Sequence, residues 1–437
     1  MSSEPDFFQH LRSELRDGRK WLDRAIVLGY AIATGLFVVA FTLLCEWTFA
    51  QFSRLAAWQP WMVLVITPAV TAGIVWAARR YAPGAAGSGI PQVKAALHPD
   101  IAPERGRRLV SLRLSIAKVA LTVAGLAGGL SIGREGPTVQ IAAGVMQHAR
   151  RWLSPNSGID RRALLIAGGA AGIAAAFNAP LAGVVFAIEE LSNRIESRAS
   201  GLIVTAIVLA GLVAVSAFGN SSYYGVIRVP RLGWDLVGPG LLVALVAGAA
   251  GGLFARLLIA SLNGAPGRFN RWRARHPVRF AAGAGLAVAV IGLVTGGATF
   301  GAGSEAVKRM LQGQEALGPL YTLLKFVATW LTAWSGVPGG IFAPSLSIGA
   351  GIGDAVARLV ASDLGPALIA MGMAGFLAAV TQAPLTAFII VMEMVDGHAM
   401  VLSLMAAAML ASLVSRMISR PLYETLADNM VEDPPRR

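Results

Sequence analysis

The sequence predicts an all-α polytopic membrane protein built from two inverted-topology repeats of tilted and broken helices. Three observations support this fold class: an apolar composition, a series of long apolar runs, and an internal repeat. Apolar residues make up 55% of the 437 residues and charged residues only 14%, whereas a soluble domain has about 25% charged residues. So few charges cannot cover a soluble surface, so most of the surface must face lipid. The same composition excludes disordered, collagen-like and disulfide-rich proteins.

The formal net charge of +13 comes from short basic clusters between apolar runs. This distribution favours positive-inside topology and contact with anionic lipid over nucleic-acid binding. The single Cys45 excludes structural disulfides and thiolate metal sites, and the five histidines lack paired-ligand spacing. We therefore expect no metal and no cofactor.

The elements follow in order along the chain. Residues 1–24 predict an amphipathic cytoplasmic helix on the membrane surface, 25–225 a first transmembrane repeat, 226–423 a second, and 424–437 a short cytoplasmic tail, all within one transport domain. Basic residues in 1–24 and 268–279 place both segments in the cytoplasm. The expected location is a bacterial inner membrane, crossed several times, with both termini cytoplasmic.

The internal repeat is the most informative pattern. Residues 133–144 align with 340–351 at an offset of 207, sharing Gly, Pro, Ile and a final Ala-Gly. Residues 165–176 match 368–379 at 8 of 12 positions, and an Ala-Pro-Leu and a glutamate (Glu189 and Glu393) recur at an offset of 204. A fainter match pairs Gly-Ser at 87–88 with Gly-Ser at 303–304. Collinear repeats with Gly/Pro-interrupted segments are typical of transporters whose site lies between the two halves.

Three Gly/Pro segments have the features of helix starts within the membrane: 87–91 (GSGIP), 133–137 (GREGP) and 339–344 (GGIFAP). Glycine permits unusual φ angles and close backbone approach, and proline suits the first helical turn. Converging helix N-termini would direct free N–H groups at one point, which predicts an anion site. Ser88 is the hydroxyl available in the first segment. The alternative is that these are packing glycines and helix kinks.

Glu135 is the main candidate for a functional carboxylate, because it lies between glycines at the start of an intramembrane helix. Its carboxylate would compete with an anion for the same N-terminal amides, and protonation would release it. The simpler alternative is a carboxylate that only stabilises the helix dipole.

Four other charged residues are candidates for supporting roles. Glu189 and Glu190 are adjacent on a helix and point about 100° apart. Because Glu189 has the repeat partner Glu393, we expect it to be buried, paired and structural, whereas Glu190 breaks the symmetry. A carboxylate at a cytoplasmic helix end is the alternative for Glu190. Lys118 is expected to be a buried, paired cation that raises the potential at the site, and Arg134 to snorkel or brace the Glu135 loop.

GSGIP, GREGP and GGIFAP, in this order, resemble the signature segments of the CLC chloride channels and proton-coupled chloride transporters, from about residue 25 to Tyr423. The resemblance implies chloride binding by Ser88, Gly89, Ile341, Phe342 and Tyr423. It also implies a gating glutamate at Glu135, intracellular proton transfer at Glu190, and a homodimer with one pore in each subunit. The supporting residues around the gate are Gly133, Arg134, Gly136, Pro137 and Lys118.

The sequence departs from the family pattern at Gln92 and Lys94, where some members have acidic residues, so the polar network around Glu190 is expected to differ. Paired cytoplasmic nucleotide-sensing domains are absent from the sequence, so regulation by adenine nucleotides is not expected. Ser88 makes chloride the default substrate rather than nitrate or fluoride.

The expected function is therefore a secondary active antiporter that exchanges chloride for protons. The alternative within the same fold is a passive, voltage- or pH-gated chloride channel. An intramembrane enzyme is a distant alternative, suggested only by a GxGD motif at 351–354 that has no Tyr-Asp partner motif in the chain.

Overall fold

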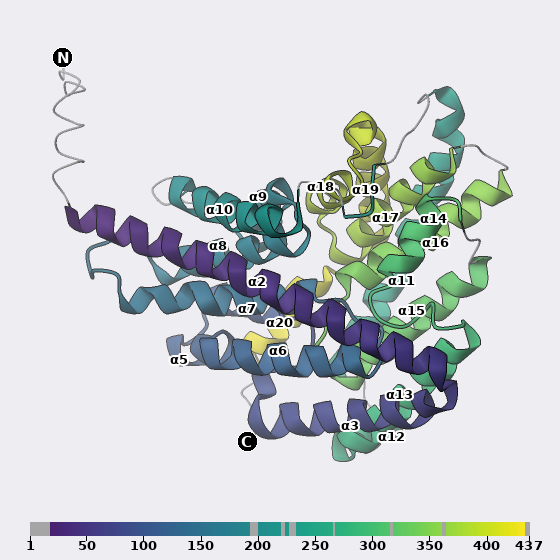
Figure 1. Ribbon diagram of the computed structural model, residues 1–437, viewed down its shortest axis with the longest axis horizontal. Helices are drawn as coiled ribbons and strands as arrows, with labels where there is room; N and C mark the ends of the chain where they lie inside the picture. The colour runs from purple at the N-terminus through teal and green to yellow at the C-terminus, as the bar shows by residue number, and fades with distance from the viewer. Residues whose placement is uncertain are drawn as a thin grey trace.

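The computed structural model describes residues 18–192, 200–219, 223–226, 233–264, 267–314, 318–360 and 364–432. Helices of the first half of the chain and of the second half lie mostly on two sides of the molecule, and α2 crosses its whole width (Figure 1). The α-helices are α2 (Gly18–Trp58), α3 (Val63–Tyr81), α4 (Ile90–Leu97), α5 (Pro103–Leu109), α6 (Leu112–Ala127), α7 (Glu135–His148), α8 (Arg161–Ala176), α9 (Pro180–Phe186), α10 (Ser200–Phe218), α11 (Val237–Asn263), α12 (Arg268–Arg275), α13 (Pro277–Val294), α14 (Ser304–Leu311), α15 (Gly318–Ser335), α16 (Phe342–Leu359), α17 (Gly365–Thr381), α18 (Pro384–Met394), α19 (Val401–Arg416) and α20 (Leu422–Glu432).

Seven helices of the described segments are long and apolar enough to cross a membrane, and they contain α2, α3, α6, α10, α11, α13 and α19. Others are much shorter: the 14 residues of α7 extend about 21 Å, against about 30 Å of hydrocarbon. The predicted mixture of full and broken helices is therefore confirmed.

Two of the predicted segments, the surface helix and the tail, lie at the ends of the chain. Residues 18–24 of the predicted surface helix form the first turns of the 41-residue α2, and residues 1–17 lie outside the described residues. The predicted tail begins inside α20, which extends to Glu432.

The repeat seen in the sequence corresponds to matching helices. The run α7–α8–α9 recurs as α16–α17–α18, with the same proline at the start of α9 and α18. The two closely matching stretches form the most enclosed helices, because residues 163–176 of α8 and 367–381 of α17 are all buried. Their Gly and Ala residues allow close helix contact, which in a membrane takes the place of hydrophobic association.

The two halves are joined by reciprocal contacts at their shared glutamates. The Glu189 carboxylate accepts hydrogen bonds from the Leu385 and Thr386 amides at the start of α18 (3.0 and 2.6 Å). The Glu393 carboxylate accepts them from the Leu181 and Ala182 amides at the start of α9 (3.3 and 2.7 Å). Each repeat thus caps a helix of the other, as two-fold related halves require. The repeat predicts this paired structural position for Glu189, although the side chain is only half-buried.

Replacing either capping glutamate by glutamine is expected to destabilise the protein by about 1 kcal/mol, because a charged acceptor on helix N-terminal amides becomes a neutral one. Thermal unfolding in detergent should show similar losses for Glu189→Gln and Glu393→Gln. The exposed Glu104 of α5 provides the control substitution, Glu104→Gln. If both cap variants unfold at the same temperature as this control, the caps contribute nothing.

Basic residues from separate segments gather on one side of the molecule: Arg161 at the start of α8 lies near Arg107 of α5 and near Arg150. On this side, the Asp23 carboxylate near the start of α2 accepts a hydrogen bond from the Ser154 amide (3.0 Å). Arg105 of α5 donates to the Val431 carbonyl of α20 (2.9 Å), and the end of α11 contacts α20 through Asn263 and Asn429 (2.7 Å). We call this face the basic side.

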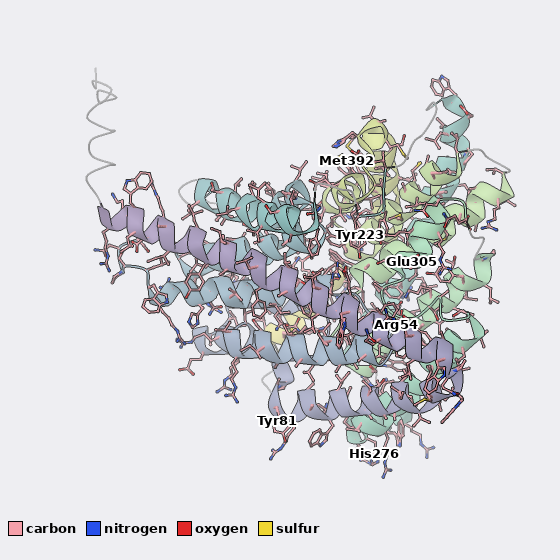
Figure 2. The ribbon with its side chains drawn as sticks, viewed as in Figure 1. Arg54, Tyr81, Tyr223, His276, Glu305 and Met392 are labelled. Atoms are coloured by element: carbon pink, nitrogen blue, oxygen red, sulfur yellow. The ribbon has the colours of Figure 1, made fainter. Side chains whose placement is uncertain are left out.

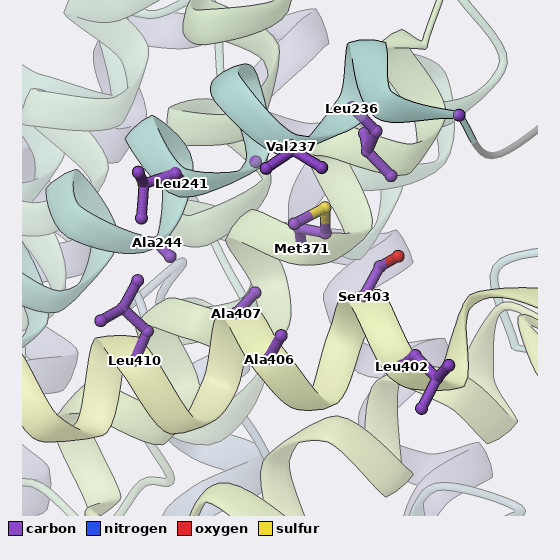
Figure 3. A pocket seen from close by; sticks show the side chains of 12 residues that line it. Leu236, Val237, Leu241, Ala244, Met371, Leu402, Ser403, Ala406, Ala407 and Leu410 are labelled. Carbon is purple, nitrogen blue, oxygen red and sulfur yellow. The ribbon is translucent and has the colours of Figure 1, made fainter.

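A cavity of about 420 Å³ lies between α11, α17 and α19 (Figure 3). Its lining is almost entirely apolar, with Leu241, Met371 and Leu410 pointing into it and Ser403 at its edge. A cavity of this kind offers no group for an ion, so the candidate ion site lies elsewhere.

Candidate functional site

The three Gly/Pro segments meet at the centre of the molecule. Gly133 and Gly340 exchange two backbone hydrogen bonds (2.8 and 2.7 Å), and the Gly339 amide donates to the Gly87 carbonyl (3.2 Å). These short bridges link loops that lie more than 200 residues apart in the sequence. The convergence that the sequence predicts is therefore present in the structure.

Each of the three segments leads into a helix, as predicted. Helix α4 begins at Ile90, α7 at Glu135 and α16 at Phe342. Gly89, which precedes α4, has φ +114°, a backbone angle that side chains rarely permit. A Cβ atom on Gly89 would also lie 2.6 Å from the Gly136 carbonyl oxygen. Glycine at these positions therefore lets the starts of α4 and α7 lie side by side.

Ser88 and Tyr423 contribute two buried hydroxyl groups to this centre. Helix α20 returns to the first half of the chain, where it lies against α4, and it also contacts α11 and α17. Tyr423 on this helix is 1% exposed, and its ring lies 6.0 Å from the Phe342 ring. The Ser88 and Tyr423 hydroxyls face each other, but neither makes a close hydrogen bond within the protein. Two buried donors without partners fit an anion better than they fit a packed core.

Ile341 and Phe342 complete this wall of the centre. Both residues are buried at the first turn of α16, where backbone amides have no helical acceptor. The Phe342 ring packs against Phe186 of α9, with centroids 6.4 Å apart. The aromatic packing holds the N-terminus of α16 in position while its amides stay available.

The Glu135 side chain folds back onto the helix N-termini. It is 4% exposed, and its carboxylate lies near the backbone amides of Arg134, Glu135 and Ala343, although Oε2 makes no close hydrogen bond. A Cβ atom on residue 133 would collide with Oε2, so glycine leaves room for the carboxylate there. The carboxylate thus lies at the N-termini of α7 and α16, one helix from each repeat.

Arg134 braces the loop that carries Glu135. Its guanidinium donates to the Glu46 carboxylate of α2 (2.8 Å) and lies 5.9 Å from the centre of the Tyr223 ring. Of the two roles that the sequence leaves open, the contacts match bracing, since the side chain is buried rather than extended to the surface.

Lys118 is fully buried, as predicted, but its partners are carbonyl groups rather than a carboxylate. Its ammonium group donates to the Ala85 and Gly87 carbonyls (2.8 and 2.6 Å), which hold the loop before Ser88. The sequence interpretation missed its counterpart, Lys325, which donates to the Thr299 and Gly301 carbonyls (2.9 and 2.7 Å). The spacing could have revealed it, because Lys118 and Lys325 are related by the offset of 207.

Glu190 lies on the basic side of the centre and is paired with Lys94. The Lys94 ammonium of α4 is 2.9 Å from Glu190 Oε2, and the Glu190 side chain is 5% exposed. Residues 187–191 form a π-helical turn that continues α9. Such turns change the direction of side chains within a helix, and here Glu189 and Glu190 reach different partners. Lys94, one of the two positions where the sequence departs from the family pattern, is thus a direct partner of Glu190.

Two other residues that the sequence singled out have local roles. Gln92 is buried and donates through its amide to the Ala86 carbonyl. Asp354, the aspartate of the GxGD motif, is ion-paired with Arg358 one turn later at 2.7 Å. This pairing on one helix face gives no support to aspartyl-protease chemistry.

Comparisons with known proteins agree with this geometry. The family model described as "Voltage gated chloride channel" matches residues 70–416. The H(+)/Cl(-) exchange transporter ClcA of Citrobacter koseri is 30% identical over 432 residues, covering 92% of this chain and 88% of the relative. A solved structure of a slow cyanobacterial Cl⁻/H⁺ antiporter superposes with a TM-score of 0.81 at 25% identity, covering 95% of this chain and 99% of the other. A CLC-type fluoride/proton antiporter shares the fold at 21% identity, with a TM-score of 0.77 and coverage of 97% and 99%. The chain therefore belongs to the voltage gated chloride channel (CLC) family of transport proteins and is not an enzyme.

Proposed function

We propose that this protein is a secondary active antiporter that exchanges chloride for protons, with Glu135 as the gate. The observation that carries the proposal is the position of the Glu135 carboxylate on the N-terminal amides of α7 and α16. An anion would use the same amides, so the carboxylate and chloride compete for one position. Protonation removes the negative charge and frees the amides, which couples anion binding to a proton.

The proposed chloride site is formed by the Ser88 and Tyr423 hydroxyls and by the backbone at Gly89, Ile341 and Phe342. The supporting observation is the pair of buried hydroxyls without close partners. Amides and hydroxyls bind a halide while allowing rapid release, as throughput requires. Lys118 supports the site from behind, because its ammonium is bound to the loop carbonyls.

The proposed proton route runs from Glu190 on the basic side toward Glu135. The supporting observation is that Tyr423 lies near both carboxylates. Glu190 would take a proton from the basic side and Glu135 would exchange it with the opposite side. Lys94 is then the resident counter-ion that a proton must replace at Glu190.

We further propose that the basic side is cytoplasmic, following the positive-inside rule. In a bacterium this means the inner membrane, with α20 and the start of α2 inside. A homodimer is proposed as well. Helices α9 and α18 are too short to span a membrane alone, and they expose Leu181 and Leu385 beside their reciprocal glutamate caps, while the π-helical turn after α9 exposes Ile188. A second copy would cover this apolar face.

The function is tested by proton flux into liposomes that contain the purified protein, driven only by a chloride gradient with the voltage clamped by an ionophore. Antiport predicts uphill proton movement. Chloride movement without protons would instead establish the passive channel, and Glu190 would lose its role. If neither ion moves, the same assay with fluoride and nitrate tests whether another anion is the substrate.

Replacing Tyr423 by phenylalanine is expected to weaken chloride binding about tenfold, because one hydrogen bond to a charged ligand is lost. Calorimetric titration with chloride measures the change. Tyr81→Phe, at an exposed tyrosine of α3, is the matched control. Equal affinities for the two variants would remove Tyr423 from the site.

A further inference from the structure

A group of arginines lies between α5 and α8 on the basic side, apart from the proposed ion sites. Arg161 is the first residue of α8, and its guanidinium packs against the backbone of α5. A Cβ atom on Gly106 would lie 2.6 Å from Arg161 Nη2 and 2.7 Å from Nη1, so glycine leaves room for the guanidinium there. Arg107 of α5 and Arg150, in a 3₁₀ turn that contacts α8, lie near Arg161. We call Arg107, Arg150 and Arg161 the arginine cluster.

The arginine cluster has no anionic partner among the described residues. The Nε and Nη2 atoms of Arg161 are buried and make no hydrogen bond there. None of the ion pairs within the described segments includes a residue of the cluster. The neighbouring Asp160 carboxylate caps α8 instead, where it accepts a hydrogen bond from the Ala163 amide (2.7 Å). Because buried N–H groups are nearly always paired, the Arg161 guanidinium is suited to bind an anion.

The chemistry of the cluster selects the kind of anion. A planar guanidinium presents parallel N–H donors, which match the oxygens of a phosphate group better than they match a spherical halide. The three cations come from three separate elements, and an anion among them would offset their mutual repulsion. We propose that the arginine cluster binds the phosphate group of a ligand on the basic side.

The surroundings of the cluster favour a phospholipid headgroup as the source of this phosphate. Trp152 follows the turn that carries Arg150, and its side chain is 63% exposed. Its Nε1 donates to the Tyr30 hydroxyl of α2 (3.1 Å). Exposed tryptophans are typical of the membrane–water interface, and anionic lipids of the cytoplasmic leaflet attract basic residues at that depth. A soluble phosphate compound has the same chemistry, and binding measurements separate the two sources.

The lipid probe is dioleoylphosphatidylglycerol, with zwitterionic dioleoylphosphatidylcholine as its reference, and native mass spectrometry of the full chain in detergent measures the bound lipid. Calorimetric titration with inorganic phosphate tests the soluble source. Arg150→Gln and Arg161→Gln should each weaken phosphatidylglycerol binding about tenfold, because each removes hydrogen bonds to a charged ligand. The control is Arg275→Gln, at an exposed arginine beside His276, and α12, which carries it, lies well apart from α5 (Figure 2). Its affinity should equal that of the wild-type protein.

Two other outcomes are informative. Binding of inorganic phosphate that depends on Arg150 and Arg161, without preference for phosphatidylglycerol over phosphatidylcholine, would confirm the phosphate site and identify a soluble ligand. Equal affinities of the two cluster variants and Arg275→Gln for both probes would overturn the inference. Anions would then be attracted only by the net charge of the basic side.

Thermal unfolding in the same detergent separates binding from a structural role. Without lipid or phosphate, Arg161→Gln should unfold at or above the wild-type temperature, because one of three like charges is removed. Phosphatidylglycerol should raise the unfolding temperature of the wild-type protein and of Arg275→Gln, but much less that of Arg150→Gln and Arg161→Gln. A less stable lipid-free Arg161→Gln that keeps the full gain from lipid would show that this arginine only holds α8 against α5. Neither measurement involves transport, so both are independent of the proposed antiport function.

Discussion

Glu135→Gln is expected to reduce chloride-driven proton flux to background while chloride continues to move. Glutamine is close in shape to protonated glutamate, but it carries no charge and takes up no proton. It therefore cannot compete with chloride for the amides of α7 and α16 that the carboxylate contacts. The variant should behave as a passive chloride pathway.

The measurement is simultaneous recording of chloride and proton flux in proteoliposomes. Glu104→Gln, at the exposed position of α5, controls for reconstitution and handling. Proton transport at the wild-type rate in Glu135→Gln would remove Glu135 from the gate. Loss of both fluxes would indicate that the carboxylate is needed to hold the three loops together, and its position beside the Ala343 and Arg134 amides would then be structural.

Glu190→Gln is expected to abolish proton coupling and leave chloride flux near the wild-type level. The reason is that Glu190 is paired with Lys94 of α4 and is not one of the groups of the proposed chloride site. Coupling is measured as the reversal potential under opposed chloride and proton gradients. An unchanged reversal potential would contradict the assigned role.

The Lys94–Glu190 pair adds a stability test that separates structure from coupling. Lys94→Met leaves a carboxylate that is 5% exposed without its counter-ion, and removing one partner of a buried pair costs about 3–5 kcal/mol. The double variant Lys94→Met/Glu190→Gln should recover most of that loss, because no uncompensated charge remains. Thermal unfolding in detergent provides both values. A double variant no more stable than Lys94→Met would mean that the pair does not interact in the folded protein.

The broken helices could be predicted because their signals are local. At Gly89-Ile90-Pro91 and at Gly136-Pro137 the residue types themselves restrict φ and remove an N–H, so the chain begins a helix there in almost any context. The repeat then predicted that these starts belong to related halves. The backbone bridge between Gly133 and Gly340 agrees with that expectation.

Contacts between distant side chains were beyond the sequence, since they depend on rotamers and on how helices pack. Lys118 was expected to be a paired cation, and in the structure its ammonium group donates to the Ala85 and Gly87 carbonyls. The offset that relates Lys325 to Lys118 was present in the sequence, yet no local pattern marked Lys325 as a residue that holds a loop. The π-helical turn at 187–191 likewise has no local signal, although it decides that Glu189 faces α18 and Glu190 faces Lys94.

Composition and backbone restriction act residue by residue, so the membrane environment, the repeat and the three helix starts could be predicted from the sequence. Which groups share a site depends instead on tertiary packing, which brings together Ser88 with Tyr423 and Glu135 with the amides of both repeats. The groups from opposite halves lie about 200 to 340 residues apart, and they meet because two-fold packing of Gly- and Ala-rich helices brings the ends of one half against the starts of the other.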